Sequence, residues 1–445
     1  MPSARDQSER PPVGQAQEEA GLGTGAGLAY PRRVYPFDLV IAACRLAPSG
    51  RPADIGIRAG RIAALGDLAG ASTRRRIGAE GRLVVPSFVD AHVHLDKAYI
   101  LDRAPSREGT LAEAIRVTAS AKRAFTVEDI QARARRLLDR AVLAGTTAMR
   151  GHVEVDPIVG LRGVEAVLPL RAEYADRLEL QLCAFAQEGI LRAPGTEALL
   201  RQALRAGADL VGGCPYNDSD GVAHVDRVFA LAREFACDVD FHADFADEPV
   251  HRHVDVVVDR TEQHGWQGRV AVGHLTELAA CDEAEQARIA GRLRASGIAV
   301  ITLPATDLYL MGRSDTRNVR RGLAPIRRLL AAGVTVAAAT NNVQNAFTPV
   351  GNADPLLLTC LLVVGAHMGG EADMAAALDM VTGAPARILG RRDHGLAVGC
   401  RADLVVLDAP TVAEAVGGLP ARALVVKDGR ITVGSEPAAR LPPLA

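Results

Sequence analysis

The stretch VVPSFVDAHVHLDK, residues 84–97, decides the fold because it joins a buried strand to two histidines at the end of that strand. Apolar residues dominate up to Ala91, and His92 and His94 follow with one residue between them. Because side chains alternate along a strand, both histidines point to the same side. Two imidazoles in this arrangement can share one metal ion, or they can be hydrogen-bonded structural histidines. The rest of the chain has to distinguish these alternatives.

Seven further short runs of β-branched or apolar residues follow this one, and Ala-, Leu- and Arg-rich segments at helical spacing separate them. The eight runs are RLVVPSFVDAH (82–92), TTAMRGHVEV (146–155), LELQLCAFA (178–186), DLVGGCPY (209–216), DVDFHADF (238–245), RVAVGHL (269–275), AVITLPAT (299–306) and VTVAAATNN (334–342). Such alternation predicts βα units around a parallel sheet. Eight strands close a TIM-type barrel, so we predict an α/β fold with a (β/α)8 barrel over residues 83–397.

The two ends of the chain have a different sequence pattern from the predicted barrel. FDLVIAACRLA and ADIGIRAGRIAALG near one end, and GCRADLVVLDA and ARALVVKDGRITVG near the other, alternate apolar and polar residues as half-buried antiparallel strands do. We therefore predict a small β-sandwich domain formed by residues 34–82 and 398–445. Residues 1–33 contain no apolar run, and we predict a disordered tail without a signal peptide or membrane anchor.

The charge and cysteine content narrow the range of partners. The 445 residues carry a formal net charge of -2, which offers no basic surface for nucleic acid or an anionic membrane. A small-molecule substrate is the expected partner, and a homo-oligomer stays open. The seven cysteines show no CxxC spacing, which favours free thiols in a cytoplasmic protein.

Polar residues gather where the predicted strands end. His152 lies at the end of the second strand, His242 and His274 at the ends of the fifth and sixth, and Asn341 at the end of the eighth. In a TIM-type barrel these ends carry the active site. A second HxH, His251 to His253, follows Pro249 away from a strand end, and we interpret it as surface. The convergence of histidines favours a metal site over a structural pair.

These residues resemble the amidohydrolase superfamily, and within it the cytosine-deaminase-like branch. The resemblance covers nearly the whole chain and includes FVDAHVHLDK, RGHVEVD, FAQEGI, DVDFHADFADEP, VAVGHLTEL and GCRADLVVLD. It implies that His92, His94 and His242 bind one divalent metal. It also implies that His274 stabilises or relays a proton beside the metal, and that Gln187 grips the amide edge of the substrate.

Two positions depart from that branch. The deaminases carry glutamate where this chain has Phe245, and the superfamily carries aspartate where it has Asn341. A phenyl ring can only pack, and a carboxamide cannot accept and return a proton in hydrolysis. Asn341 can still bind the metal through its oxygen or hydrogen-bond the water, so it remains a candidate for orienting that water. Asp244, two residues after His242, and His274 are the candidate replacements. Asp244 can equally be a carboxylate that orients an imidazole.

Lysine is rare, with only Lys97, Lys122 and Lys427 in the chain. No predicted inner strand contains lysine, so the carboxylated lysine that bridges two metals in some superfamily members is excluded. We therefore predict one divalent ion per chain, with zinc expected and iron, manganese or cobalt as alternatives. Lys97 either meets substrate or pairs with a carboxylate such as Asp96, and we favour the pair.

The phenylalanine and asparagine together resemble an offshoot that includes molinate and phenylurea hydrolases. We predict a metal-dependent amidohydrolase that hydrolyses a non-peptide C–N bond of a small amide, urea or carbamate-like molecule through water activated by the metal. Phe245 would line a substrate pocket more apolar than a pyrimidine site. Deamination of an aminated heterocycle is the alternative, and a catalytically silent metal-binding barrel is a further one.

Overall fold

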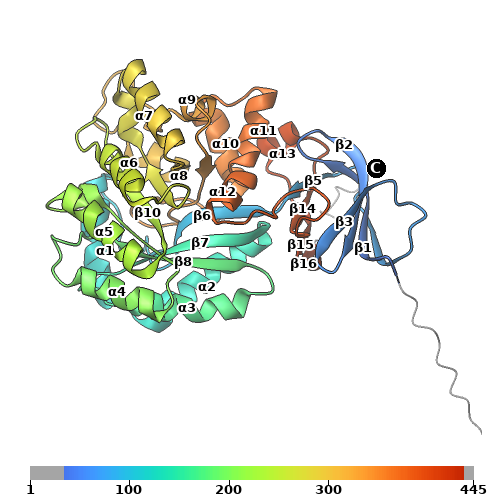
Figure 1. The fold of residues 1–445 in the computed structure, drawn as a ribbon, viewed down its shortest axis with the longest axis horizontal. Helices are drawn as coiled ribbons and strands as arrows, with labels where there is room; N and C mark the ends of the chain where they lie inside the picture. Colours follow the sequence, from blue (N-terminus) through green and yellow to red (C-terminus); the bar gives the residue numbers. More distant parts are fainter. Residues whose placement is uncertain (1–34, 435–445) are drawn as a thin grey trace, which may run out of the picture. The chain divides into compact units, whose positions relative to one another are not determined.

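The computed structural model describes residues 35–434, so the tail predicted over residues 1–33 lies outside the described part. Eight parallel strands form one sheet in sequence order, with helices outside it (Figure 1). They are β6 (Phe88–His94), β7 (Thr146–Glu154), β8 (Glu179–Ala186), β9 (Leu210–Gly213), β10 (Asp238–Ala243), β11 (Val270–His274), β12 (Ala299–Thr302) and β13 (Val336–Ala338). This confirms the predicted barrel.

The backbone of Asn341 closes the barrel between its last and first strands. The N–H of His94 donates to the carbonyl of Asn341 at 2.7 Å, and the N–H of Asn341 donates to the carbonyl of His92 at 2.8 Å. The buried carboxylate of Asp90 fills the same seam and accepts from the backbone N–H of His92 and of Thr340. Asn341 is therefore held beside the two histidines by main-chain bonds, whatever its side chain does.

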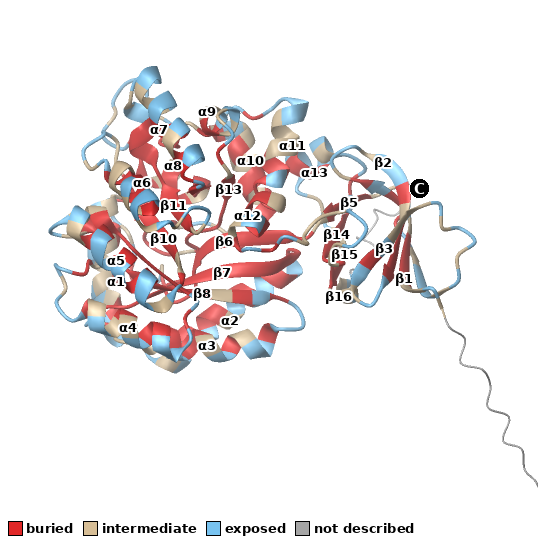
Figure 2. Ribbon diagram, in the orientation of Figure 1, coloured by how far each residue is buried: buried red, intermediate tan, exposed pale blue. Residues whose placement is uncertain are grey.

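Most helices cover the barrel with an apolar face, and α2 is an example. In α2, Thr126 caps the first turn by accepting from the N–H of Asp129, and Ile130, Ala134 and Leu137 are buried one or two turns apart. Figure 2 shows buried strands inside and exposed outer helix faces. The helices are α1 (Leu111–Ala121), α2 (Val127–Leu143), α3 (Arg162–Tyr174), α4 (Thr196–Ala206), α5 (Gly221–Phe235), α6 (His253–His264), α7 (Glu283–Ala295), α8 (Pro304–Leu310), α9 (Ile326–Ala331), α10 (Pro355–Gly365), α11 (Glu371–Asp379), α12 (Gly383–Ile388) and α13 (Val412–Gly418).

A second sheet combines strands from both ends of the chain, which confirms the predicted small β domain. Its eight strands pair into one continuous sheet in the order β16-β15-β14-β5-β1-β2-β3, with β4 paired to β1. The bounds are β1 (Phe37–Leu46), β2 (Arg51–Arg58), β3 (Arg61–Gly66), β4 (Thr73–Gly78), β5 (Leu83–Pro86), β14 (Leu404–Leu407), β15 (Arg422–Lys427) and β16 (Arg430–Gly434). The run RLVVPSFVDAH is thus divided at Ser87: residues 83–86 pair with this sheet, and residues 88–94 begin the barrel.

None of the helices in residues 35–434 is both long and apolar enough to cross a membrane. All seven cysteines lie in this range and are free thiols, as expected, although only Cys44, Cys183, Cys214 and Cys237 are buried.

Candidate metal centre and active site

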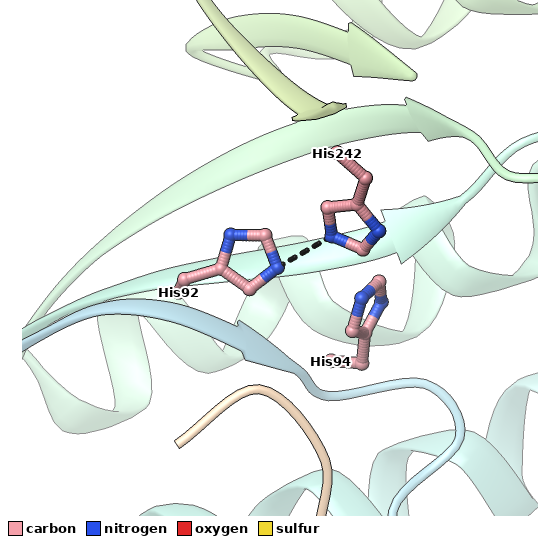
Figure 3. A group of neighbouring side chains, drawn as sticks. All are labelled: His92, His94 and His242. Carbon is pink, nitrogen blue, oxygen red and sulfur yellow. Dashed lines mark hydrogen bonds between the residues drawn. The ribbon is translucent and has the colours of Figure 1, made fainter. Parts of the chain in front are cut away.

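Three predicted ligands converge at the C-terminal ends of β6 and β10 (Figure 3). His92, His94 and His242 are buried, and each offers a ring nitrogen within 4.8 Å of the others. The Nε2 atoms of His92 and His242 lie 2.7 Å apart, and neither ring nitrogen of His94 has a hydrogen-bond partner. Buried nitrogens left without partners are costly, and a shared cation would satisfy them. The donor set therefore fits a divalent metal.

The protonation of these histidines suits metal binding. Burial lowers the pKa of His92 to about 3, and it holds the pKa values of His94 and His242 well below the usual histidine range. Neighbouring histidines lower the pKa of His92 and His242 further. All three rings are consequently neutral at neutral pH, and a neutral imidazole is the form that binds a metal.

Asp240 lies behind His92. Its Oδ1 is 3.5 Å from Nδ1 of His92 and 3.6 Å from Nε2 of His152, while its Oδ2 accepts from Arg150 at 3.0 Å. Burial alone would raise the pKa of Asp240, but His152 and His92 hold it well below the usual range. A carboxylate at Nδ1 leaves Nε2 of His92 as the metal-binding nitrogen.

His92, His152 and Asp240 also lie close enough together to hold a metal. The guanidinium of Arg150 already pairs with Asp240, however, and its positive charge opposes a second cation there. No role is expected from the sequence pattern alone for Asp240, Arg150 or His152. Asp240 stands two residues before His242, and Arg150 two before His152, so strand alternation pointed to both.

His274, at the end of β11, is held by an aspartate that sequence reasoning missed. Its Nδ1 lies 2.6 Å from Oδ1 of Asp307 in α8, which leaves Nε2 as the ring nitrogen available to other groups. Burial raises the pKa of Asp307 even though His274 acts to lower it. The ring of Phe245 stacks on His274 with centroids 3.8 Å apart. The predicted apolar residue therefore packs directly against the predicted proton carrier.

Asp244 is turned toward a helix. Its two oxygens accept from the backbone N–H of His253 at 2.7 Å and of Val254 at 3.0 Å, at the start of α6. Burial and the nearby Glu277 raise its pKa to about 7. Strand alternation does not place Asp244 on the face of His242, because β10 ends at Ala243 and Asp244 has a left-handed backbone with φ of 48°.

Asn341 presents a free acceptor. Its Nδ2 donates to the hydroxyl of Thr306 at 3.1 Å, and its buried Oδ1 has no partner. That oxygen has a lone pair for a ligand or for a water hydrogen, but no proton to exchange.

Gln187 and Lys97 lie together at the ends of β8 and β6. Lys97 is buried and donates to Glu154 at 2.7 Å, so its main carboxylate partner is Glu154 and not the expected Asp96. Its Nζ is also 3.5 Å from Oε1 of Gln187 and 4.3 Å from the centre of the Phe347 ring. The buried Nε2 of Gln187 has no partner. These groups can both donate hydrogen bonds to a substrate oxygen.

A barrel with converging histidines at this end defines a metal-dependent hydrolase of the TIM-barrel type. Residues 75–433 match the model of the amidohydrolase family Amidohydro_3, and the chain belongs to that family. The family is metal-dependent.

Among known proteins, the chain is 31% identical to N-isopropylammelide isopropyl amidohydrolase of Pseudomonas sp. strain ADP over 90% of this chain and 98% of the relative. It is similar to the crystal structure of 5-methylcytosine deaminase from Klebsiella pneumoniae, with 31% identity, a TM-score of 0.86, and 91% and 99% of the two chains covered. It is also similar to the crystal structure of N-isopropylammelide isopropylaminohydrolase from Burkholderia multivorans. The identity is 32% and the TM-score 0.78, and the match covers 88% of this chain and 97% of that chain. The predicted family and its cytosine-deaminase-like relatives are confirmed, and the relatives' names describe the predicted class of C–N hydrolases.

Proposed function

We propose that this protein hydrolyses a non-peptide C–N bond of a small molecule with one divalent metal, most simply zinc, held by His92, His94 and His242. The observation that carries the proposal is the convergence of three buried histidines: neither ring nitrogen of His94 has a partner, and the ring of His242 lies 4.9 Å from that of His274. When bound, a divalent ion polarises a carbonyl-type carbon and lowers the pKa of water toward about 7.

The chain itself supplies the proton transfer. His274 accepts a proton from the attacking water at Nε2 and returns it to the leaving amine, while Asp307 orients the ring through Nδ1 and stabilises its cation. Asn341 accepts a hydrogen bond from the water through Oδ1. Asp244, tied to the start of α6, has a positioning role in this proposal and does not carry the proton.

The substrate binds on the side of Gln187 and Lys97. Their N–H groups donate to an oxygen beside the scissile bond, and Phe245 gives the pocket an apolar wall. No glutamate stands at position 245 to protonate a ring nitrogen, so an N-substituted amide, urea, carbamate or exocyclic amine is favoured. The similarity to N-isopropylammelide isopropyl amidohydrolase supports a substituted leaving amine.

Deamination is the second candidate, because 5-methylcytosine deaminase has a closely similar fold at 31% identity. A silent metal-binding barrel is disfavoured. It would give no reason to keep the buried His274–Asp307 pair and the unpartnered Nε2 of Gln187 next to a metal centre.

Metal analysis and a substrate panel test the proposal together. We expect about one metal per chain in the wild type, its loss in His242→Ala, and its retention in His264→Ala, a matched removal of a partly exposed histidine on α6. The panel comprises N-isopropylammelide, a phenylurea, a thiocarbamate and 5-methylcytosine. Release of a substituted amine supports the proposal, and release of ammonia from 5-methylcytosine alone supports deamination. A metal-loaded protein inactive on the whole panel and on related ureas and carbamates would contradict it.

A further inference from the structure

Lys122 is a buried cation that the proposed reaction does not use. It begins the 3-10 turn Lys122–Ala124 after α1, and it is only 1% exposed. Its Nζ lies 2.6 Å from Glu154, 2.7 Å from Asp156 and 2.7 Å from Glu188. These three carboxylates are close enough together to hold a metal ion, but the ammonium group already pairs with all of them.

Two of these carboxylates are next to the residues that are proposed to bind substrate, one through a hydrogen bond and the other in the sequence. Glu154 contacts Lys122 through one oxygen and accepts from Lys97 at 2.7 Å through the other. Glu188 follows Gln187 in the chain, so its side chain fixes the backbone that carries that amide. Lys122 therefore links the end of β7 to the segment after β8 that carries Gln187, and through Glu154 it also reaches Lys97 after β6.

We propose that Lys122 is a positioning residue, which holds Lys97 and Gln187 in the geometry that binds substrate. The proposal rests on the proposed function, because that function makes these two residues the substrate-binding groups. Without Lys122, three carboxylates, two of them fully buried, would face one another without the cation that lies between them. Mutual repulsion would then displace Glu154 and Glu188, and Lys97 and Gln187 with them.

The electrostatics support this arrangement. Burial would lower the pKa of Lys122, but the three carboxylates raise it above the usual lysine range. Burial would raise the pKa of Glu154, but Lys122 and Lys97 lower it to about 2. Lys122 and Glu154 are therefore both charged at neutral pH.

The alternative is that Lys122 only stabilises the fold, and Lys427 provides the matched control. Lys427 is equally buried, in β15 of the second sheet, where its Nζ lies 2.5 Å from Asp428 and 3.7 Å from Asp403. Lys427→Met removes a buried ammonium group far along the chain from the site residues. Lys122→Met removes a buried ammonium group beside the site residues. Comparison of the two variants therefore separates local positioning from general destabilisation.

The first measurement needs no substrate. Metal-loaded, full-length protein labelled with 13C and 15N in lysine contains three labelled side chains, because the chain has three lysines. We expect Lys122→Met to shift the Lys97 side-chain resonance while that of Lys427 stays in place, and Lys427→Met to leave the Lys97 resonance unchanged. A Lys97 resonance that coincides with the wild type in Lys122→Met would overturn the proposal, whatever the substrate panel shows.

The second measurement separates KM from kcat on the substrate that the panel identifies. We expect Lys122→Met to raise KM at least tenfold, with kcat within about threefold and metal content unchanged, and Lys427→Met to change neither constant. Equal changes in both variants, or a fall in kcat alone, would refute positioning. If Lys122→Met does not fold, Glu188→Gln leaves Lys122 two carboxylates and should still raise KM. An unchanged KM in that variant would likewise count against the proposal.

Discussion

Replacing Asp240 with asparagine removes the carboxylate behind a metal ligand while keeping its shape. Oδ1 of Asp240 lies 3.5 Å from Nδ1 of His92, so the variant loses the charge that orients that ring. Loss of such an orienting group typically weakens metal binding 10- to 100-fold, or about 1.4–2.7 kcal/mol. Arg150, only 2% exposed, also loses its carboxylate partner. An unpaired buried charge lowers the free energy of unfolding by about 3–5 kcal/mol.

The assay is competition for the metal with a chelator of known affinity, at a temperature where the variant stays folded. Asp238→Asn is the control, because Asp238 lies two residues earlier on β10 and pairs with Arg269 at 2.8 Å at a partly exposed position. We expect metal affinity within about twofold of wild type in the control and at least tenfold weaker in Asp240→Asn. Wild-type affinity in folded Asp240→Asn would refute the idea that Asp240 orients His92.

Three further outcomes are expected. Asp307→Asn should lower kcat by about 10²- to 10⁴-fold with metal content unchanged, and unaltered turnover would show that His274 acts without it. Gln187→Leu should raise KM about 2- to 10-fold, which corresponds to the free energy of one hydrogen bond, with a smaller effect on kcat. An unchanged KM would show that Gln187 does not bind the substrate. Metal-free protein should lose stability as pH falls. Burial lowers the folded pKa of His92 to about 3, below the unfolded value near 6.5, so the stabilisation is complete above pH 6.5 and disappears toward pH 3. Urea unfolding in chelator should show a loss of about 1.4 kcal/mol per pH unit for each such histidine, and a flat profile would contradict this.

The sequence predicted the barrel and the gathering of the histidines because both depend on local patterns. Strand length and alternation locate His92 and His94, and parallel strands bring their ends to one edge. Asp307 could not be found in this way, because it reaches His274 from a helix 33 residues later. Likewise, the partner of Lys97 is 57 residues away in Glu154, whereas the nearby Asp96 is not its hydrogen-bond acceptor.

Asp244 shows where the local rule stops. Residues two apart share a face only while the strand continues, and β10 ends between His242 and Asp244. A left-handed residue at that point turns the carboxylate toward the start of α6. Sequence alone did not reveal this turn, since it is an aspartate and not a glycine that adopts the positive φ.

The burial of all three lysines has a practical consequence for anyone who handles this protein. Lys97, Lys122 and Lys427 are each 1% exposed, so no lysine amine of the native chain is accessible to acylating reagents or to a lysine-specific protease. Amine-directed dyes, cross-linkers and resins should therefore not react at lysine until the structure opens. Modification or cleavage at lysine would then occur only in molecules that have unfolded locally or globally. The rate of that reaction would measure how often the structure opens, without any engineered probe.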